Sequence, residues 1–227
     1  MHEEKHFESS DIVKDIVIGM ADGLTVPFAL AAGLSGVAVS NGIIITAGIA
    51  EIIAGSIAMG LGGYLAGKTE RDHYFSELQR EYEEVEHLPE REKAEIREIM
   101  AGYGISTKTQ ELVTEELSQN KDKWVDFMMK FELGLEEPKK VRASQSARNI
   151  ALSYIAGGLI PLSAYFVTHD PYSGLMISCT ITLLALLIFG YYKSKVTGQP
   201  ALRGSLTTAG IGAIAAFAAY IIARQFQ

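Results

Sequence analysis

Five long stretches of apolar residues constrain this chain more than any other feature of its sequence. They cover residues 16–39, 42–66, 149–168, 173–192 and 204–223. About 20 consecutive apolar residues carry an α-helix across a hydrocarbon core of roughly 30 Å. The stretches lack the alternation of barrel strands, and a helix satisfies its own backbone groups in lipid. The sequence therefore predicts an all-α membrane protein with five transmembrane helices.

The charged residues are concentrated in the middle of the chain. Residues 16–67 hold two charged side chains, those of Asp22 and Glu51, whereas residues 68–140 hold 19 acidic and 12 basic ones. The net charge of this middle segment, −7, equals that of the whole chain of 227 residues. Neither a soluble single domain nor a disordered chain has this distribution. We expect an N-terminal tail at residues 1–15, two transmembrane helices in 16–67, a charged insert at 68–140 and three further transmembrane helices in 141–227.

The distribution of Lys and Arg among the loops predicts the orientation of the chain. The short links at residues 40–42 and 169–172 contain neither residue type, whereas 14 basic residues lie between the second and third stretches. Lys193, Lys195 and Arg203 lie between the fourth and fifth stretches. Cytoplasmic loops carry the excess of Lys and Arg. The N-terminus and the insert are therefore predicted to be cytoplasmic.

Two acidic residues inside the membrane stretches require an explanation, because a charge at that depth costs at least a few kcal/mol. Asp22 precedes Pro27, which cannot donate to the carbonyl of Gly23, so the helix should bend or open there and offer oxygen ligands to a divalent cation. Glu51 and Met59 lie on the next helix and could border the same pathway. The alternatives are that each acid lies near an interface or bonds a neighbouring helix, and that Met59 only fills space.

The second stretch also carries small residues at every fourth position. Such a strip lets another helix approach closely, from the same chain or from a second copy. A lone hairpin must cover its two acids with protein or water, so we favour a homodimer that buries them at a shared seam. The strip consists of Ala50, Ala54, Ala58, Gly62 and Ala66.

The insert has the composition of a small helical metal-binding domain. We expect three helices, at residues 69–87, 89–101 and 107–134, the last with a break near Asn120 that would make a fourth piece. Glutamates recur at helical spacing on the first two, and Met128 lies one turn from Glu132 on the third. Carboxylates with thioethers suit ferrous iron, manganese, cobalt, nickel or zinc. The alternatives are a solvated acidic surface and methionines packed against Trp124. The acidic residues are Glu77, Glu81, Glu84, Glu92 and Glu95.

Three segments of the sequence closely resemble the vacuolar iron transporter family. They are residues 22–36 (DGLTVPFALAAGLSG), residues 51–66, which end in GSIAMGLGGYLA, and residues 124–135, which begin WVDFMMKFE. The resemblance extends over nearly the whole chain. It implies a homodimer of five-span subunits that exports ferrous iron, and often manganese, from the cytosol in exchange for protons.

The resemblance also implies roles for individual residues. Asp22, Glu51 and Met59 would line the transport pathway, with the first helix at the dimer seam. The metal-binding insert of the family would correspond to Glu81, Glu84, Glu92, Glu95, Met128, Met129 and Glu132. The N-terminal segment is shorter than the leader of many plant and fungal members, so we expect a prokaryotic plasma membrane rather than a vacuolar one.

These observations lead to one main hypothesis, a proton-coupled divalent-metal antiporter without a prosthetic group, enzymatic activity or a nucleic-acid partner. A carboxylate in a low-dielectric passage holds a proton until a cation replaces it, which couples the two fluxes. One alternative is a membrane-anchored, ferritin-like iron-binding protein or ferroxidase that uses two Glu-x-x-His steps, Glu70 to His73 and Glu84 to His87. Another is a metal sensor or scaffold with its spans as an anchor.

Overall fold

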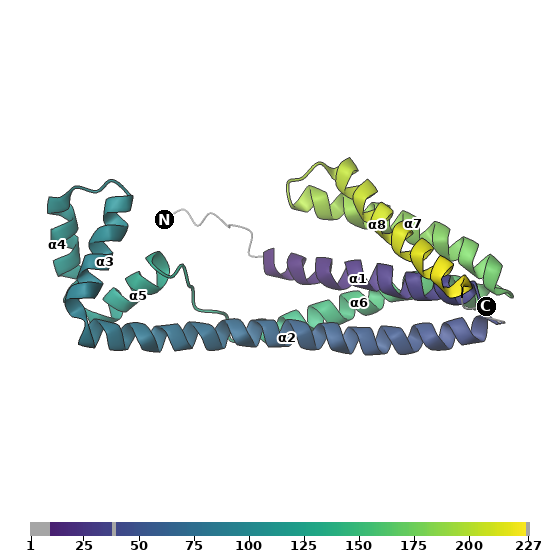
Figure 1. Cartoon of the computed structure of the whole chain (residues 1–227), viewed down its shortest axis with the longest axis horizontal. Coiled ribbons are helices and arrows are strands. Elements are labelled where there is room, and N and C mark those ends of the chain that lie inside the picture. Colours follow the sequence, from purple (N-terminus) through teal and green to yellow (C-terminus); the bar gives the residue numbers. More distant parts are fainter. Residues whose placement is uncertain (1–9, 38–39, 226–227) are drawn as a thin grey trace. The chain divides into compact units, whose positions relative to one another are not determined.

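The computed structural model describes residues 10–37 and 40–225, which form eight helices and no strand (Figure 1). Five of the helices are long and apolar enough to cross a membrane, namely α1, α2, α6, α7 and α8. The predicted all-α class with five candidate spans is confirmed. Residues 1–9 of the predicted tail and the predicted end of the first span at Val39 lie outside the described residues. The helices are α1 (Ser10–Ser35), α2 (Asn41–His87), α3 (Pro89–Gly102), α4 (Thr107–Ser118), α5 (Lys121–Phe131), α6 (Arg142–Val167), α7 (Pro171–Val196) and α8 (Ala201–Arg224).

The helix α2 is longer than the sequence suggested. We expected a transmembrane helix that ends near Ala66 and a separate helix from residue 69, but one helix of 47 residues runs through both. Gly67 at the boundary costs only about 1 kcal/mol in a helix interior, and the residues after it are strong helix formers such as Lys, Glu and Arg. The charged insert therefore begins on a continuation of the second apolar helix.

The chain divides into two compact units, residues 1–64 with 143–227 and residues 65–142. In the first unit, hydrogen bonds tie both ends of α1 and the N-terminal end of α2 to α6. The Oγ of Ser146 donates to the buried carboxylate of Asp15 at 2.9 Å. The hydroxyls of Ser35 and Tyr165 are 2.8 Å apart, and the Nδ2 of Asn41 donates to the Tyr165 carbonyl at 3.1 Å. These contacts align the three helices that carry the candidate transport residues.

The second unit contains the C-terminal part of α2 together with α3, α4 and α5. Pro89 occupies the first turn of α3, where its missing N–H costs nothing, and the Asn120 side chain caps α5 by accepting from the backbone N–H of Lys123 at 3.1 Å. The helices α4 and α5 are therefore separate, with Gln119 and Asn120 between them. The buried core of this unit consists of Val85, Ile96, Met100, Trp124, Val125, Met128 and Met129.

Candidate metal-binding and transport sites

Three carboxylates meet in the second unit. Glu81 projects from α2, Glu92 from α3, and Glu132 directly follows α5. One carboxylate oxygen of each lies within 4.8 Å of the others, a spacing that could hold a metal ion. The helices bring these residues together because Val85 and Ile96, one turn beyond Glu81 and Glu92, both pack in the hydrophobic core of the unit.

Burial makes this cluster unusual. The side chains of Glu81 and Glu92 are 0% exposed, and neither oxygen of either carboxylate has a hydrogen-bond partner within the described chain. Glu132 is exposed and leaves one side of the cluster open to solvent. Buried polar atoms are almost always hydrogen-bonded, and a buried charge is paired or bound to a metal. The cluster therefore requires either protons or a cation.

The same burial raises the pKa of all three carboxyls. Burial, reinforced by the charge of Glu132, raises the pKa of Glu81 to about 7. Burial, reinforced by the charge of Glu95, raises the pKa of Glu92 to about 7. The pKa of Glu132 is also raised, first by desolvation of its carboxyl group and then by the charge of Glu95, although the residue as a whole is exposed. At neutral pH the cluster holds protons that a divalent cation can displace.

Two predicted ligands, Glu84 and Glu95, lie beside this cluster rather than in it. The guanidinium of Arg91 pairs with Glu95 at 3.0 Å, and that of Arg80 lies 3.8 Å from Glu84. Both carboxylates are half-buried, and their charges still contribute to the raised pKa of Glu92. Of the five glutamates expected as ligands, the structure brings three together and gives the other two arginine partners.

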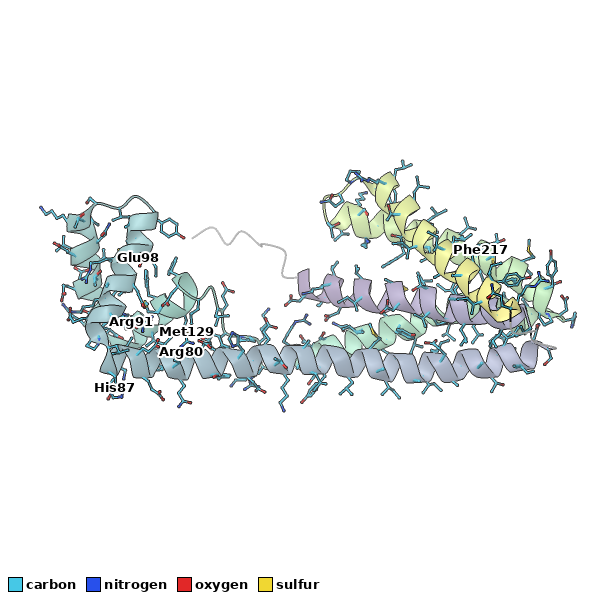
Figure 2. All side chains as sticks on the ribbon, viewed as in Figure 1. Arg80, His87, Arg91, Glu98, Met129 and Phe217 are labelled. Atoms are coloured by element: carbon cyan, nitrogen blue, oxygen red, sulfur yellow. The ribbon has the colours of Figure 1, made fainter. Side chains whose placement is uncertain are left out.

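The two predicted methionine ligands are core residues in this structure. Met128 and Met129 are 0% and 1% exposed and pack with Trp124 and Val125. Figure 2 labels Met129 in the second unit, on the side of α2 that faces the other helices of this unit. Met128 is linked to the acidic cluster through the backbone, because the N–H of Glu132 donates to its carbonyl at 3.0 Å. The packing alternative considered from the sequence thus describes their surroundings, and metal ligation by their sulfur atoms remains a prediction.

A second group of polar residues lies in the first unit. The hydroxyl of Tyr154 on α6 donates a short hydrogen bond to Oε1 of Glu51 on α2. The other oxygen of Glu51 is buried and has no hydrogen-bond partner among the described residues. The alternative that Glu51 bonds a neighbouring helix is therefore realised for one oxygen, while the second remains available to a proton or a cation.

Tyr154 lies between the helices that carry the two membrane acids. A Cβ on Gly23 of α1 would overlap the backbone carbonyl of Tyr154, and one on Gly55 of α2 would overlap its hydroxyl. Gly23 directly follows Asp22, and Gly55 is one turn beyond Glu51. Asp22 and Glu51 therefore project from helices that approach the same residue of α6.

Asp22 and Met59 are half-buried, and α1 continues as a helix through Pro27 without the expected opening. Pro27 is buried, and a Cβ on Gly158 of α6 would lie 3.1 Å from its ring, so close packing supports the helix at that point. The carbonyl of Gly23 still lacks the donor that residue 27 would otherwise supply. It remains a possible oxygen ligand next to Asp22.

Sequence reasoning missed two residues of this region. Tyr154 is one of several hydroxyl side chains in the third apolar stretch, and it is a weak signal because tyrosine is also common at membrane interfaces. Asp15 was assigned to the tail but is 1% exposed on α1, where it accepts hydrogen bonds from Ser146 and Asn149. It lies seven residues before Asp22, two helical turns away, and this spacing is the signal that could have placed both on one face.

The two Glu-x-x-His steps do not form a common site within the chain. Both lie on α2, about 21 Å apart along its axis. His73 is exposed and lies 3.8 Å from Glu77, and Figure 2 shows His87 pointing away from the other helices of its unit. A ferritin-like centre requires ligands from several facing helices. This arrangement does not favour the ferroxidase alternative.

Comparison with known proteins decides the family. A model described as VIT family matches residues 13–224. The chain belongs to the VIT family. It is 54% identical to "Vacuolar iron transporter 1" of Tulipa gesneriana over 226 residues, which are 100% of this chain and 92% of that protein. It is likewise 54% identical to "Vacuolar iron transporter 1" of Arabidopsis thaliana, with 100% and 90% of the two chains covered. "Protein CCC1" of Saccharomyces cerevisiae is 36% identical, with 96% of this chain and 70% of that protein covered.

Membership of the VIT family has two direct consequences. The family consists of transporters, so the expectation that the chain is not an enzyme is confirmed. The expected prokaryotic plasma membrane is wrong, because the close relatives are plant and fungal vacuolar transporters. That expectation relied on the short N-terminal segment.

Proposed function

We propose that this VIT family member moves ferrous iron, and also manganese, out of the cytosol across a vacuolar membrane in exchange for protons. The observation that carries the proposal is the buried, unpartnered pair of Glu81 and Glu92 beside Glu132. Oxygen ligands with raised pKa values form a cation site that exchanges protons for metal. The names of the plant relatives support iron as the metal and the vacuole as the compartment.

In this proposal the second unit collects the metal. The cluster exposes Glu132 to solvent, so an ion can enter from water and displace the protons of Glu81 and Glu92. Glu84 and Glu95 add negative charge nearby, which attracts cations, and each pairs with an arginine beside the cluster. The excess of basic residues in the loops on this side supports a cytosolic location.

The transmembrane step uses Asp22, Glu51 and Met59, and Tyr154 is added to this set. The free oxygen of Glu51 and the carboxylate of Asp22 bind the cation or a proton, so that the two ions compete for the same groups. Tyr154 orients Glu51 through its hydrogen bond. The thioether of Met59 favours borderline metals over magnesium and calcium.

A homodimer is part of the proposal. The strip of small residues on α2 is exposed along its whole length, at Ala50, Ala54, Ala58, Gly62 and Ala66. A smooth helix face of this kind supports close packing by a second copy within the membrane. Chemical crosslinking of the protein in native membranes would detect the dimer, and monomers alone at every crosslinker concentration would contradict it.

Flux through proteoliposomes tests the proposed function. With an imposed pH gradient, the parent protein should accumulate Fe²⁺, and Asp22→Asn should lose nearly all uptake because it removes the group at which the ions compete. Asp170→Asn is the matched control, because Asp170 is exposed and acts as the N-cap of α7. Uptake by Asp22→Asn equal to that of the parent would exclude Asp22 from the pathway. Oxygen consumption with Fe²⁺ and no uptake would favour the ferroxidase alternative.

A further inference from the structure

The connection between α7 and α8 carries a basic hollow that the transport proposal does not use. Its volume is about 370 Å³, and its lining includes the cations Lys193 and Arg203 with the polar residues Thr197, Gln199 and Thr207. Lys193 is half-buried in the last turns of α7, and Arg203 is exposed in the first turn of α8. Two cations from consecutive helices thus border one polar hollow.

Close packing of the two helices holds these cations at the hollow. A Cβ on Gly204 would overlap the Oγ of Ser194, so the backbones of α7 and α8 approach directly at these two residues. Lys193 and Arg203 are the residues immediately before them in the sequence. Because the contact fixes the backbone on both sides, the two cationic side chains start from neighbouring, well-defined positions.

The hollow has an excess of positive charge that the described residues do not neutralise. The sequence contains no acidic residue after Asp170, and neither Lys193 nor Arg203 forms an ion pair with any residue that the structure describes. The first backbone hydrogen bond of α8 is donated by Gly204 to Pro200, which leaves the earlier N–H groups of this helix without intrahelical acceptors. Both features favour an anion.

The position of the hollow identifies the anion. It lies where two membrane-spanning helices end, next to the exposed rings of Tyr191 and Tyr192, which are typical of the level of the lipid headgroups. The anions concentrated at that level are lipid phosphates, and basic pockets between spanning helices bind them on the cytoplasmic side. We propose that Lys193 and Arg203 form a binding site for the phosphate headgroup of an anionic phospholipid.

Lipid retention by the full-length protein tests this site. Detergent-solubilised protein is equilibrated with phosphatidylinositol 4-phosphate or with phosphatidylcholine, and bound lipid is counted by native mass spectrometry. Each Lys or Arg near an anionic surface contributes about a factor of five to binding, so Lys193→Gln with Arg203→Gln should weaken retention of the phosphoinositide about 30-fold. Retention of phosphatidylcholine should not change.

Lys195 provides the matched control. It is exposed on the same helical turn and does not line the hollow, so Lys195→Gln should change retention less than twofold. Equal losses for Lys193→Gln and Lys195→Gln would show that diffuse surface charge attracts the lipid, which overturns the site. Equal retention of both lipids by the parent protein would also overturn it. Melting temperatures of all variants within about 2 °C of the parent verify that folding is intact.

A third arm separates a lipid from a soluble phosphate. Inorganic phosphate and glycerophosphoinositol phosphate, which has the headgroup without the acyl chains, are added as competitors. The proposal predicts that neither displaces the lipid at equimolar concentration, because the acyl chains contribute through their contact with the apolar flanks of α7 and α8. Displacement by either competitor at equimolar concentration would assign the hollow to a soluble anion and contradict a lipid site.

Discussion

Metal binding by the second unit should depend steeply on pH. The pKa values of Glu81 and Glu92 are about 7, raised mainly by burial. A metal ion must displace the protons that these carboxyls hold, so acidification from pH 7.5 to 6 should weaken binding. Two groups with pKa 7 are each about 76% ionised at pH 7.5 and about 9% at pH 6, which corresponds to a loss of roughly 70-fold in apparent affinity.

Ordinary carboxyls would behave differently over the same range. With a pKa of 4.5, two glutamates are almost fully ionised at both pH values, and the apparent affinity would change by roughly 1.1-fold.

The number of protons released on metal binding also differs between the two pH values. Displacement from Glu81 and Glu92 should release about 1.8 protons per metal at pH 6 and about 0.5 at pH 7.5. The raised pKa of Glu132 adds to this release.

The intact protein offers a convenient assay. Trp124 is the only tryptophan of the chain and lies in the core of the second unit, so its fluorescence reports on this unit alone. Titration with Fe²⁺ under anaerobic conditions, and with Mn²⁺, gives the affinity at each pH, and a pH indicator in weak buffer counts the protons. Glu98→Gln on the exposed face of α3 is the control. Affinities within twofold of each other at pH 6 and 7.5 would refute the role assigned to burial.

Three further predictions concern single residues. Glu92→Gln should raise the melting temperature of the metal-free protein at pH 8 but not at pH 5. The pKa of Glu92 is raised by folding, so this carboxyl destabilises the folded state increasingly as the pH rises from 4.5 to about 7. An unchanged melting temperature at pH 8 would contradict this. Tyr154→Phe should leave Glu51 without its hydrogen-bond donor, lower the free energy of unfolding by about 1–3 kcal/mol, and lower the Fe²⁺ flux. A flux equal to that of the parent would remove Tyr154 from the pathway. Gly23→Ala should lower the melting temperature in detergent and cost about 1–3 kcal/mol, because its methyl group meets the Tyr154 carbonyl. Gly210→Ala on α8, where a methyl group meets no atom within 4 Å, is the control, and equal melting temperatures would refute the contact.

The sequence predicted the helical class and the five spans because long apolar runs have only one stable form in lipid. It could not predict where α2 ends, since Gly67 and the change from apolar to charged residues are both compatible with an uninterrupted helix. For the acidic cluster, helical spacing indicated which glutamates share a face. Only the packing of α2, α3 and α5 determines that Glu81, Glu92 and Glu132 meet while Glu95 pairs with Arg91.

Tyr154 shows a different limit of sequence reasoning. Its role depends on close approaches at Gly23 and Gly55, which lie on two other helices, and no local pattern links these three residues. The same reasoning explains why Asp15 was missed. Its burial follows from contacts with Ser146 and Asn149, more than 130 residues away in the chain. Contacts of this kind belong to the tertiary fold, so the seven-residue spacing of Asp15 and Asp22 indicates a shared helix face but not which residues cover it.

Simultaneous recording of iron and protons in the same proteoliposomes tests the central claim most directly. With an acidic lumen and Fe²⁺ outside, iron should enter while the lumenal pH rises, and both signals should disappear in Asp22→Asn. Uptake of Fe²⁺ at the parental rate with the lumenal pH unchanged would contradict exchange for protons at the membrane acids.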